Sequence, residues 1–240
     1  MSRVHSHAME LIVDGVGEAL RRLATLDPDL RDAATASLVV SGAATVLSLV
    51  LGIPLGALLG LARFRGRNLV LSLVNTGMGF PPVAIGLFVA ILVWRSGPLG
   101  ELDWYCTRTA MVGAQFLLAV PTVIGLTAIA VQSVDPMLQI QLLALGADRL
   151  QMLGILVRET RLVLLTAAMA AFGAVISEIG ASLMVGCNIK GDTRILTTAI
   201  VLDTGRGEFG GAIALALILL VFIFAVNAVT TWAQQRRPAA

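Results

Sequence analysis

Five long stretches without a charged side chain limit what this sequence can fold into. They contain no Asp, Glu, Lys or Arg, and they run over residues 33–62, 68–94, 109–134, 162–177 and 209–235. Such stretches supply α-helices of about 20 residues, the length that crosses a hydrocarbon core of roughly 30 Å. Charged residues make up 13% of the chain, whereas soluble domains carry about 25%. The sequence therefore predicts an all-α polytopic membrane protein with five transmembrane helices.

The predicted organisation is an amphipathic amino-terminal segment, residues 1–30, followed by one transmembrane domain, residues 31–235. In the first segment apolar residues recur at helical spacing opposite acidic ones, which is typical of a helix lying in the membrane interface. These apolar residues are Met9, Ile12, Val13, Val16, Leu20 and Leu23. The sequence LDPDL at residues 26–30 should end this helix. The expected spans are residues 36–62, 69–94, 109–132, 162–186 and 210–233, with a cytoplasmic region over 134–161.

Arginine placement orients the predicted spans. The short loop after the first span carries Arg63, Arg65 and Arg67 and no acid, and short loops rich in arginine stay in the cytoplasm. Because successive spans alternate in direction, the amino terminus lies outside and the carboxyl terminus inside. We expect a multi-pass protein of the cell (inner) membrane.

Several kinds of chemistry are excluded. The chain has no G-x-x-x-x-G-K-[ST] motif, so it does not bind ATP by a P-loop. Its two histidines, His5 and His7, lie in the amino-terminal segment, so we expect no metal site, no cofactor and no catalytic residue. Cys106 and Cys187 fall in loops expected outside the cytoplasm. A disulfide between them is one alternative, but two free thiols are favoured because nothing in the sequence fixes their distance.

The second predicted span contains GMGFPPVAIG, with Gly79 followed by Pro81 and Pro82. Two consecutive prolines remove two amide donors from a helix interior and clash with the preceding turn. Lipid does not satisfy the freed carbonyls, so this part of the span should face protein or a watery path. A half-helix that begins here would point its amide groups at an anion. The alternative is a kink without a ligand role.

A carboxylate, Glu178, lies between Ser177 and Gly180 near the outer end of the fourth predicted span. Ionisable groups at membrane depth face the bundle interior or water and are functional candidates. An unpaired carboxylate would repel an anionic cargo, so we interpret Glu178 as holding an outer gate. Its partner would be Arg194 or a backbone amide. A carboxylate that merely reaches interfacial water is the alternative.

The loop that follows carries three basic residues, Lys190, Arg194 and Arg206, among acidic ones. Positive groups at the mouth would help to receive a dianion at a docking interface. Residues 197–200 could re-enter the membrane or lie flat on it. An ordinary solvated loop is the alternative.

The region between the third and fourth spans predicts two short helices. Asp135-Pro136 is a typical helix start, Gly146 ends the first helix, and Asp148 caps the second. Such a cytoplasmic elbow could dock into a groove on a soluble partner, or it could simply lie on the bilayer. The candidate coupling residues are Leu138, Ile140, Gln141, Leu142, Leu145, Gly146, Ala147 and Asp148.

The first span also carries a stripe of small residues, Gly52, Gly56 and Gly60. A glycine at every fourth position permits close contact between membrane helices. Small residues are frequent in such helices, however, so the stripe alone does not identify the contact.

The elbow resembles the loop by which permease subunits of bacterial ABC importers meet their ATPase. In the family signature E-A-A-x-x-x-G, Gly146 falls on the glycine, but the first three positions read Ile140-Gln141-Leu142, so the usual acid is missing. A closer resemblance covers nearly the whole chain. The segments FRGRNL, NTGMGFPPVAIGL, RSGPLG and ISEIGASLMVGCNIKGDTRILTTAIVLDTGRGEFGGAIALAL resemble tungstate-type permeases of the molybdate/tungstate/sulfate group.

This resemblance implies the type I permease fold of ABC importers, with two copies forming a homodimer around the translocation path. It also implies two ATPase subunits inside and an oxyanion-binding protein outside, with no nucleic-acid partner. The expected cargo is tungstate, with molybdate as a second cargo. Sulfate or another oxyanion is the alternative within this class. A stand-alone secondary transporter or channel is the alternative from another class.

Overall fold

The computed structural model describes residues 2–25 and 27–235, with side chains from residue 13 onward except residue 233. Every regular element in the described part is a helix, and turns and loops connect these helices. The helices are α1 (Ser2–Ala24), α2 (Pro28–Leu61), α3 (Arg67–Met78), α4 (Pro82–Val93), α5 (Arg108–Gln132), α6 (Pro136–Ala144), α7 (Arg149–Glu159), α8 (Arg161–Ile176), α9 (Gly180–Gly186), α10 (Leu196–Gly205) and α11 (Phe209–Gln235), with a 3₁₀ turn at Gly100–Leu102.

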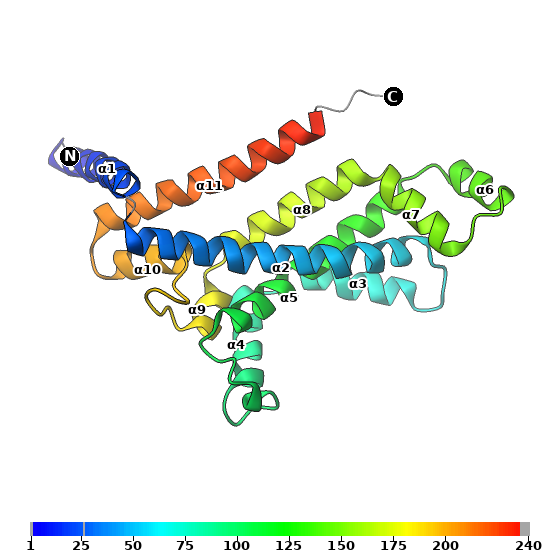
Figure 1. The fold of residues 1–240 in the computed structure, drawn as a ribbon, viewed down its shortest axis with the longest axis horizontal. Coiled ribbons are helices and arrows are strands. Elements are labelled where there is room, and N and C mark those ends of the chain that lie inside the picture. Colours follow the sequence, from blue (N-terminus) through cyan, green and yellow to red (C-terminus); the bar gives the residue numbers. More distant parts are fainter. Residues whose placement is uncertain (1, 26, 236–240) are drawn as a thin grey trace.

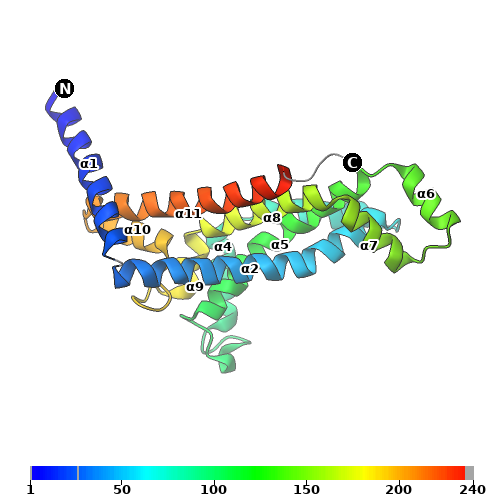
Figure 2. The same ribbon diagram turned by 45° about the horizontal axis from the view of Figure 1, so that its top comes forward.

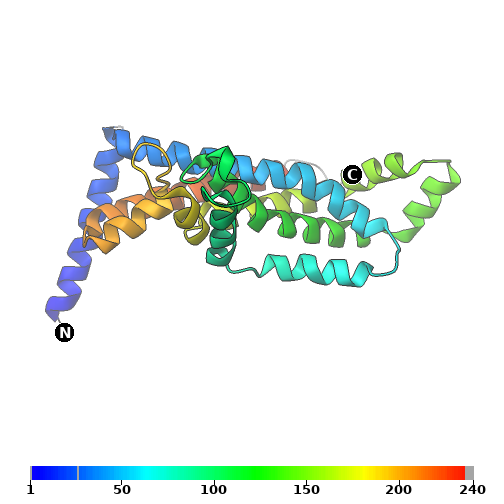
Figure 3. The same ribbon diagram turned by 90° about the horizontal axis from the view of Figure 1, so that it is seen from below.

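The long helices form an elongated bundle. Figure 1 shows α2, α5, α8 and α11 running along one direction, with α6 and α7 at one end and α1 and α10 at the other. Seen from below, α3 lies beside α5 on the outside of the bundle (Figure 3). α4 leaves this direction and projects to one side, where it packs against α9.

The glycine stripe of α2 forms the contact with α5. A Cβ atom added at Gly52 would lie 2.7 Å from Val123 Cγ1, and one added at Gly56 would lie 2.5 Å from the carbonyl oxygen of Ile124. Gly60 approaches Val131 in the same way. The close-packing interpretation of the stripe is therefore confirmed, because a side chain at these positions would separate the two helices.

Three helices are long and apolar enough to cross a membrane, namely α2, α5 and α11, and up to five spans result if each of two bent helix pairs is one span. The pair α3 and α4 is bent by 98°, and the pair α7 and α8 by 72°. The predicted all-α fold is confirmed, and the three to five candidate spans agree with the five that were predicted.

The fourth predicted span, residues 162–186, is not one helix. α8 ends at Ile176, and α9 begins at Gly180 after a turn. At this turn the Glu178 side chain accepts a hydrogen bond from the backbone of Ala181 and so satisfies one of the free amides at the start of the new helix. At about 1.5 Å per residue, the 16 residues of α8 cover only about 24 Å.

The amino-terminal helix also matches its prediction where it is described. α1 ends at Ala24, and α2 starts at Pro28 behind an Asp27 cap, so the LDPDL sequence separates the two helices. α1 packs on α11 and tilts away from the bundle (Figure 2). Its apolar side remains exposed, at Val13, Val16, Leu20 and Leu23. The side chains of His5, His7, Met9 and Ile12 lie outside the described part.

Cys106 and Cys187 form a disulfide with Cα atoms 5.1 Å apart. The favoured sequence interpretation, two free thiols, is therefore wrong. The fold brings the cysteines together because α4 and α9 pack side by side, so that the loops after them meet. A backbone hydrogen bond from Cys106 N to Val185 O, 2.9 Å long, holds the same junction.

Candidate transport, docking and coupling sites

The double proline breaks the second predicted span sharply. α3 ends at Met78 and α4 begins at Pro82, with a bend of 98° between them. Gly79, Pro81 and Pro82 are exposed in the single copy. The turn recovers part of its hydrogen bonding locally, since Phe80 N donates to Gly77 O at 3.3 Å and Ala84 N donates to Pro81 O at 3.0 Å. The site is therefore a true interruption of the helix, uncovered on one side.

α4 packs closely against α9. A Cβ atom added at Gly86 would lie 2.6 Å from Ala181 Cα, and one added at Gly180 would lie 2.5 Å from Val83 Cγ2. These two glycines let the half-helix after the proline break touch the short helix after Glu178. The structure thus brings together the two candidate gate regions, Pro81–Pro82 and 177–180, which lie about a hundred residues apart in the chain.

Glu178 forms hydrogen bonds with the first turns of two helices, α9 and α10. Its carboxylate accepts from Ala181 N at 2.8 Å, and its carbonyl accepts from the Thr197 hydroxyl at 3.0 Å. Arg194 instead donates to the side-chain oxygen of Asn188 at 3.3 Å. Of the two predicted partners, the backbone amide is therefore right and Arg194 is wrong. The neighbouring Ser177 hydroxyl donates back to Gly173 O at 2.7 Å, within its own helix end.

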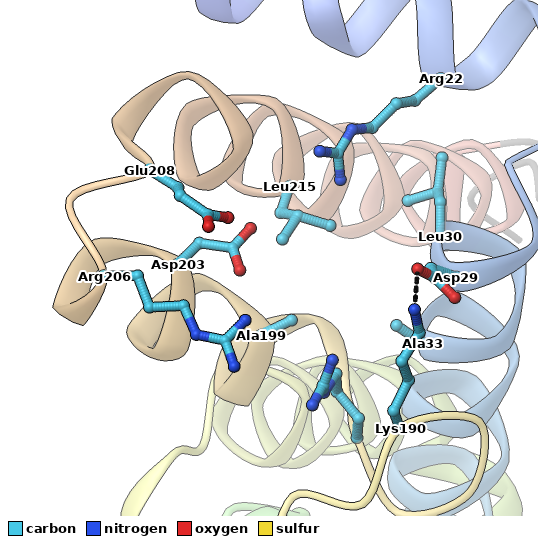
Figure 4. A pocket seen from close by; sticks show the side chains of 11 residues that line it. Arg22, Asp29, Leu30, Ala33, Lys190, Ala199, Asp203, Arg206, Glu208 and Leu215 are labelled. Carbon is cyan, nitrogen blue, oxygen red and sulfur yellow. Dashed lines mark ion pairs between the residues drawn. The ribbon is translucent and has the colours of Figure 1, made fainter.

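The three predicted docking cations line one polar pocket of about 250 Å³. Figure 4 shows Lys190 and Arg206 on opposite sides of this outer pocket, with Asp203 and Glu208 above and Arg22 of α1 closing the top. Lys190 forms an ion pair with Asp29 at 2.6 Å. The alternative of an ordinary solvated loop does not hold for residues 196–199, which are buried in α10.

Electrostatics in the outer pocket centre on Asp203. Burial raises the pKa of this carboxyl above its ordinary range, and the nearby Glu208 carboxylate raises it further. Arg22, Arg206 and Arg194 act in the opposite direction without cancelling the effect. Asp203 therefore takes up a proton more readily than an exposed aspartate does.

Sequence reasoning missed three contributors to these sites. Arg22 and Asp29 line the outer pocket, but no local pattern links the amino-terminal segment to the loop around Lys190. Gln115 lies fully buried in α5 and donates from Nε2 to the Ser182 hydroxyl of α9 at 3.1 Å. The sequence did contain one sign of Gln115, because a side-chain amide stands out within a stretch that has no charged residue.

At the opposite end, α6 and α7 form the predicted elbow. Asp135 accepts from Met137 N at 2.8 Å to cap α6, and Pro136 is its first residue. Gly146, with φ of +79°, follows the end of α6. Asp148 and Gln151 form a reciprocal capping box at the start of α7. The predicted starts and stop of the elbow are confirmed.

The elbow exposes an apolar surface. Leu145 is 83% exposed and Ile140 is 58% exposed, and Gln141 and Asp148 also face outward. Leu142 is buried, whereas Leu138 and Ala147 are half-buried. Behind the elbow, a cavity of about 410 Å³ separates α6 and α7 from the end of α2 near Arg63 and Phe64. Ile140, Leu143 and Leu145 are all exposed here, and a group of exposed apolar side chains is suited to contact with another protein.

A helical membrane bundle with a broken helix, a polar outer pocket and an apolar elbow defines the membrane-embedded subunit of a transporter. A family model described as the binding-protein-dependent transport system inner membrane component matches residues 52–237, and the chain belongs to this family.

Several relatives are similar to this chain over most of their length. The chain is 41% identical to a probable anion ABC transporter permease protein of Haloferax volcanii, covering 84% of this chain and 89% of that protein. It is 38% identical to the tungstate uptake system permease protein TupB of Peptoclostridium acidaminophilum, covering 92% and 97%. It is 30% identical to the molybdenum transport system permease protein ModB of Escherichia coli K12, covering 81% and 92%.

Solved structures share the fold. An inward-facing MetNI methionine ABC transporter chain superimposes with a TM-score of 0.69 at 16% identity, covering 86% of this chain and 94% of that chain. A chain of a bacterial alginate ABC transporter, in complex with its periplasmic protein, gives 0.62 at 19% identity, covering 85% and 79%. The architecture is therefore that of type I ABC importer permeases.

Proposed function

We propose that this chain is the permease subunit of an ABC importer that moves tungstate into the cell, with molybdate as a second cargo. The observation that carries the proposal is the 38% identity to a tungstate permease over 92% of the chain. Similarity to molybdenum permeases is lower, at 30% for ModB. The chain contains no P-loop motif, so ATP hydrolysis belongs to a separate subunit.

The elbow supplies the contact with that ATPase. Its apolar tip around Leu145, together with the exposed Ile140 and Gln141, offers a compact docking surface. The family's usual acid is absent at positions 140–142, so this contact rests on apolar burial rather than on an ion pair.

A second copy of the chain would cover the proline break. Gly79, Pro81 and Pro82 are exposed, and irregular backbone at membrane depth is tolerated where protein covers it or where it lines a watery path. A homodimer with α3 and α4 at its centre would place the break against a twin and beside a watery path. Half-helix α4 would then point its amide end toward a passing anion.

The orientation has two supports. Arg63, Arg65 and Arg67 mark the elbow end as cytoplasmic. The Cys106–Cys187 disulfide joins the loop before α5 to the end of α9, and neither of these belongs to the elbow. Disulfides persist in oxidising compartments outside the cytoplasm. The amino terminus is therefore outside and the carboxyl terminus inside.

The outer pocket would receive the substrate-binding protein. Four cations, Lys190, Arg194, Arg206 and Arg22, line this pocket beside three carboxylates, Asp29, Asp203 and Glu208, so its lining carries a small excess of positive charge. Such groups steer an acidic surface or a dianionic cargo during encounter.

Elemental mass spectrometry tests the cargo. Cells lacking the chain are compared with complemented cells at trace tungstate, molybdate and sulfate, with cellular tungsten, molybdenum and sulfur as readouts. We expect loss of tungsten, with a smaller loss of molybdenum. Loss of sulfur alone would favour the sulfate alternative, and no change in any element would contradict an oxyanion cargo. Transport by the purified chain in vesicles without any ATPase would instead favour a stand-alone transporter.

A further inference from the structure

Beside the outer pocket lies a second hollow of different chemistry. This apolar groove, about 250 Å³ in volume, runs between the end of α1, the start of α2 and one side of α11. Leu30, Ala34 and Ile218 form its buried floor, and Leu38 and Phe222 stand at its sides. The groove opens along α2 and α11, two of the three helices long enough to cross a membrane. A hydrocarbon chain is the natural occupant of such a surface.

One end of the apolar groove carries a cation and an anion that are only partly satisfied. Arg31 lines this end with 70% of its side chain exposed, and its ion pair with Asp32 is long, at 3.8 Å. Asp27 accepts from Asp29 N through Oδ1 at 3.0 Å, while its Oδ2 lies 3.9 Å from Arg22 Nε. One guanidinium and one carboxylate oxygen therefore remain able to bind a ligand.

We propose that the apolar groove binds an aminophospholipid, of the phosphatidylethanolamine class. An acyl chain would fill the groove, the phosphate would contact Arg31, and the primary ammonium would donate to Asp27. Three charged residues line the groove, and Arg22 among them is already paired with Glu18 at 2.7 Å. Arg31 and Asp27 remain as one cation and one anion, which match a zwitterion better than a purely anionic lipid. A choline headgroup lacks N–H donors, so it could not hydrogen-bond to Asp27. The proposal depends on neither the cargo nor the orientation.

Occupancy of the apolar groove would also bear on the outer pocket. Arg22 and Leu30 line both hollows and form the wall between them. A lipid seated on one side would therefore restrict the position of α1 relative to α2, and with it the Arg22 guanidinium on the other side.

Native mass spectrometry of the full-length purified chain tests the proposal. The probes are phosphatidylethanolamine, phosphatidylcholine and phosphatidylglycerol with the same acyl chains. We expect the first lipid to be retained roughly tenfold more strongly than either of the others, as one charge-assisted hydrogen bond allows. Equal retention of the three lipids, preference for phosphatidylglycerol or retention of none would overturn the proposal.

Matched variants locate the site. Asp27→Asn keeps a helix-capping side chain but should remove the preference for ethanolamine over choline. Asp32→Asn, a neighbouring carboxylate outside the groove lining, should leave the preference unchanged. Thr35→Trp, at an exposed position of the groove, should reduce retention of every lipid without changing thermal unfolding. Equal effects of Asp27→Asn and Asp32→Asn, or undiminished retention in Thr35→Trp, would place the lipid elsewhere.

Discussion

At the residue scale, the main contact of the Glu178 carboxylate is a hydrogen bond that it accepts from the backbone, rather than an ion pair. Its 2.8 Å bond from Ala181 N fixes the start of α9. Glu178→Ala should lower the free energy of unfolding by about 1 kcal/mol, as loss of a helix cap does. Glu178→Gln keeps an acceptor oxygen but forms a weaker bond than a carboxylate. We expect coupled ATP hydrolysis and transport, measured with the partner ATPase in vesicles, to fall in the order Glu, Gln, Ala. Unchanged transport and hydrolysis in Glu178→Gln would rule out a gate role for this carboxylate.

Asp203 should make the stability of the chain depend on pH. Its pKa is raised in the folded state above the ordinary value of 3.8, so the folded chain binds more protons than the unfolded chain between those two pKa values. The free energy of unfolding therefore falls as the pH rises through this window and is constant above it. Asp203→Asn should be more stable than wild type at pH 7, with the difference shrinking toward pH 4.

Thermal unfolding of the detergent-solubilised chain between pH 4 and pH 7.5 measures this difference. Asp103→Asn, on an exposed turn away from the outer pocket, is the control. A difference between Asp203→Asn and wild type that does not vary with pH would contradict the assignment to Asp203.

At the scale of elements, the α2–α5 contact depends on missing side chains. Gly56→Ala would place a methyl group 2.5 Å from the carbonyl oxygen of Ile124, a backbone atom that cannot move away alone. We expect a loss of about 1–3 kcal/mol, typical of overpacking, seen as a lower unfolding temperature and yield. Gly42→Ala is the matched control on the same helix, since nothing lies within 4 Å of its added Cβ. Equal effects of the two substitutions would contradict the close-packing explanation.

Substitutions on the elbow should weaken ATPase binding without lowering the stability of the bundle. Leu145→Asp puts a charge on a tip that is 83% exposed, so the bundle should unfold at an unchanged temperature while ATPase binding and stimulated hydrolysis are lost. Leu150→Asp is the comparison, because Leu150 is 78% exposed on α7 but lies outside the predicted contact set. Co-purification of the ATPase measures binding. An effect of Leu150→Asp alone, or of neither change, would contradict the proposed contact.

The elements were largely predictable because their signals are local. Asp135, Gly146 and Asp148 mark helix ends through bonds to residues two or three positions away, and charge-free stretches mark long helices. The break at residues 177–179 was missed because an apolar sequence gives no sign that a glutamate will cap a new helix. The outer pocket and the disulfide join residues that are distant in the chain, such as Lys190 with Asp29. The spacing of apolar and polar residues along the sequence does not indicate which distant residues will meet.

At the scale of the whole molecule, the disulfide allows the orientation to be tested. After treatment of intact cells with a reductant, a membrane-impermeant maleimide should label Cys106 and Cys187 without permeabilisation. In a Cys106→Ser, Cys187→Ser background, Gln141→Cys on the elbow should be labelled only after permeabilisation. The reverse pattern would show that the amino terminus lies inside. Equal labelling of both positions in intact cells would mean that the cells had leaked, which a cytoplasmic marker protein detects.

The uncovered break at Pro81 and Pro82 has a consequence for biogenesis. A lone copy presents a sharply bent and exposed stretch of backbone within a bundle that must enter lipid. Because a second copy would cover this bend, unpaired copies should be less stable in the membrane than paired ones, and therefore shorter-lived. The cell would then hold this protein at a level set by pairing, however much of it is synthesised.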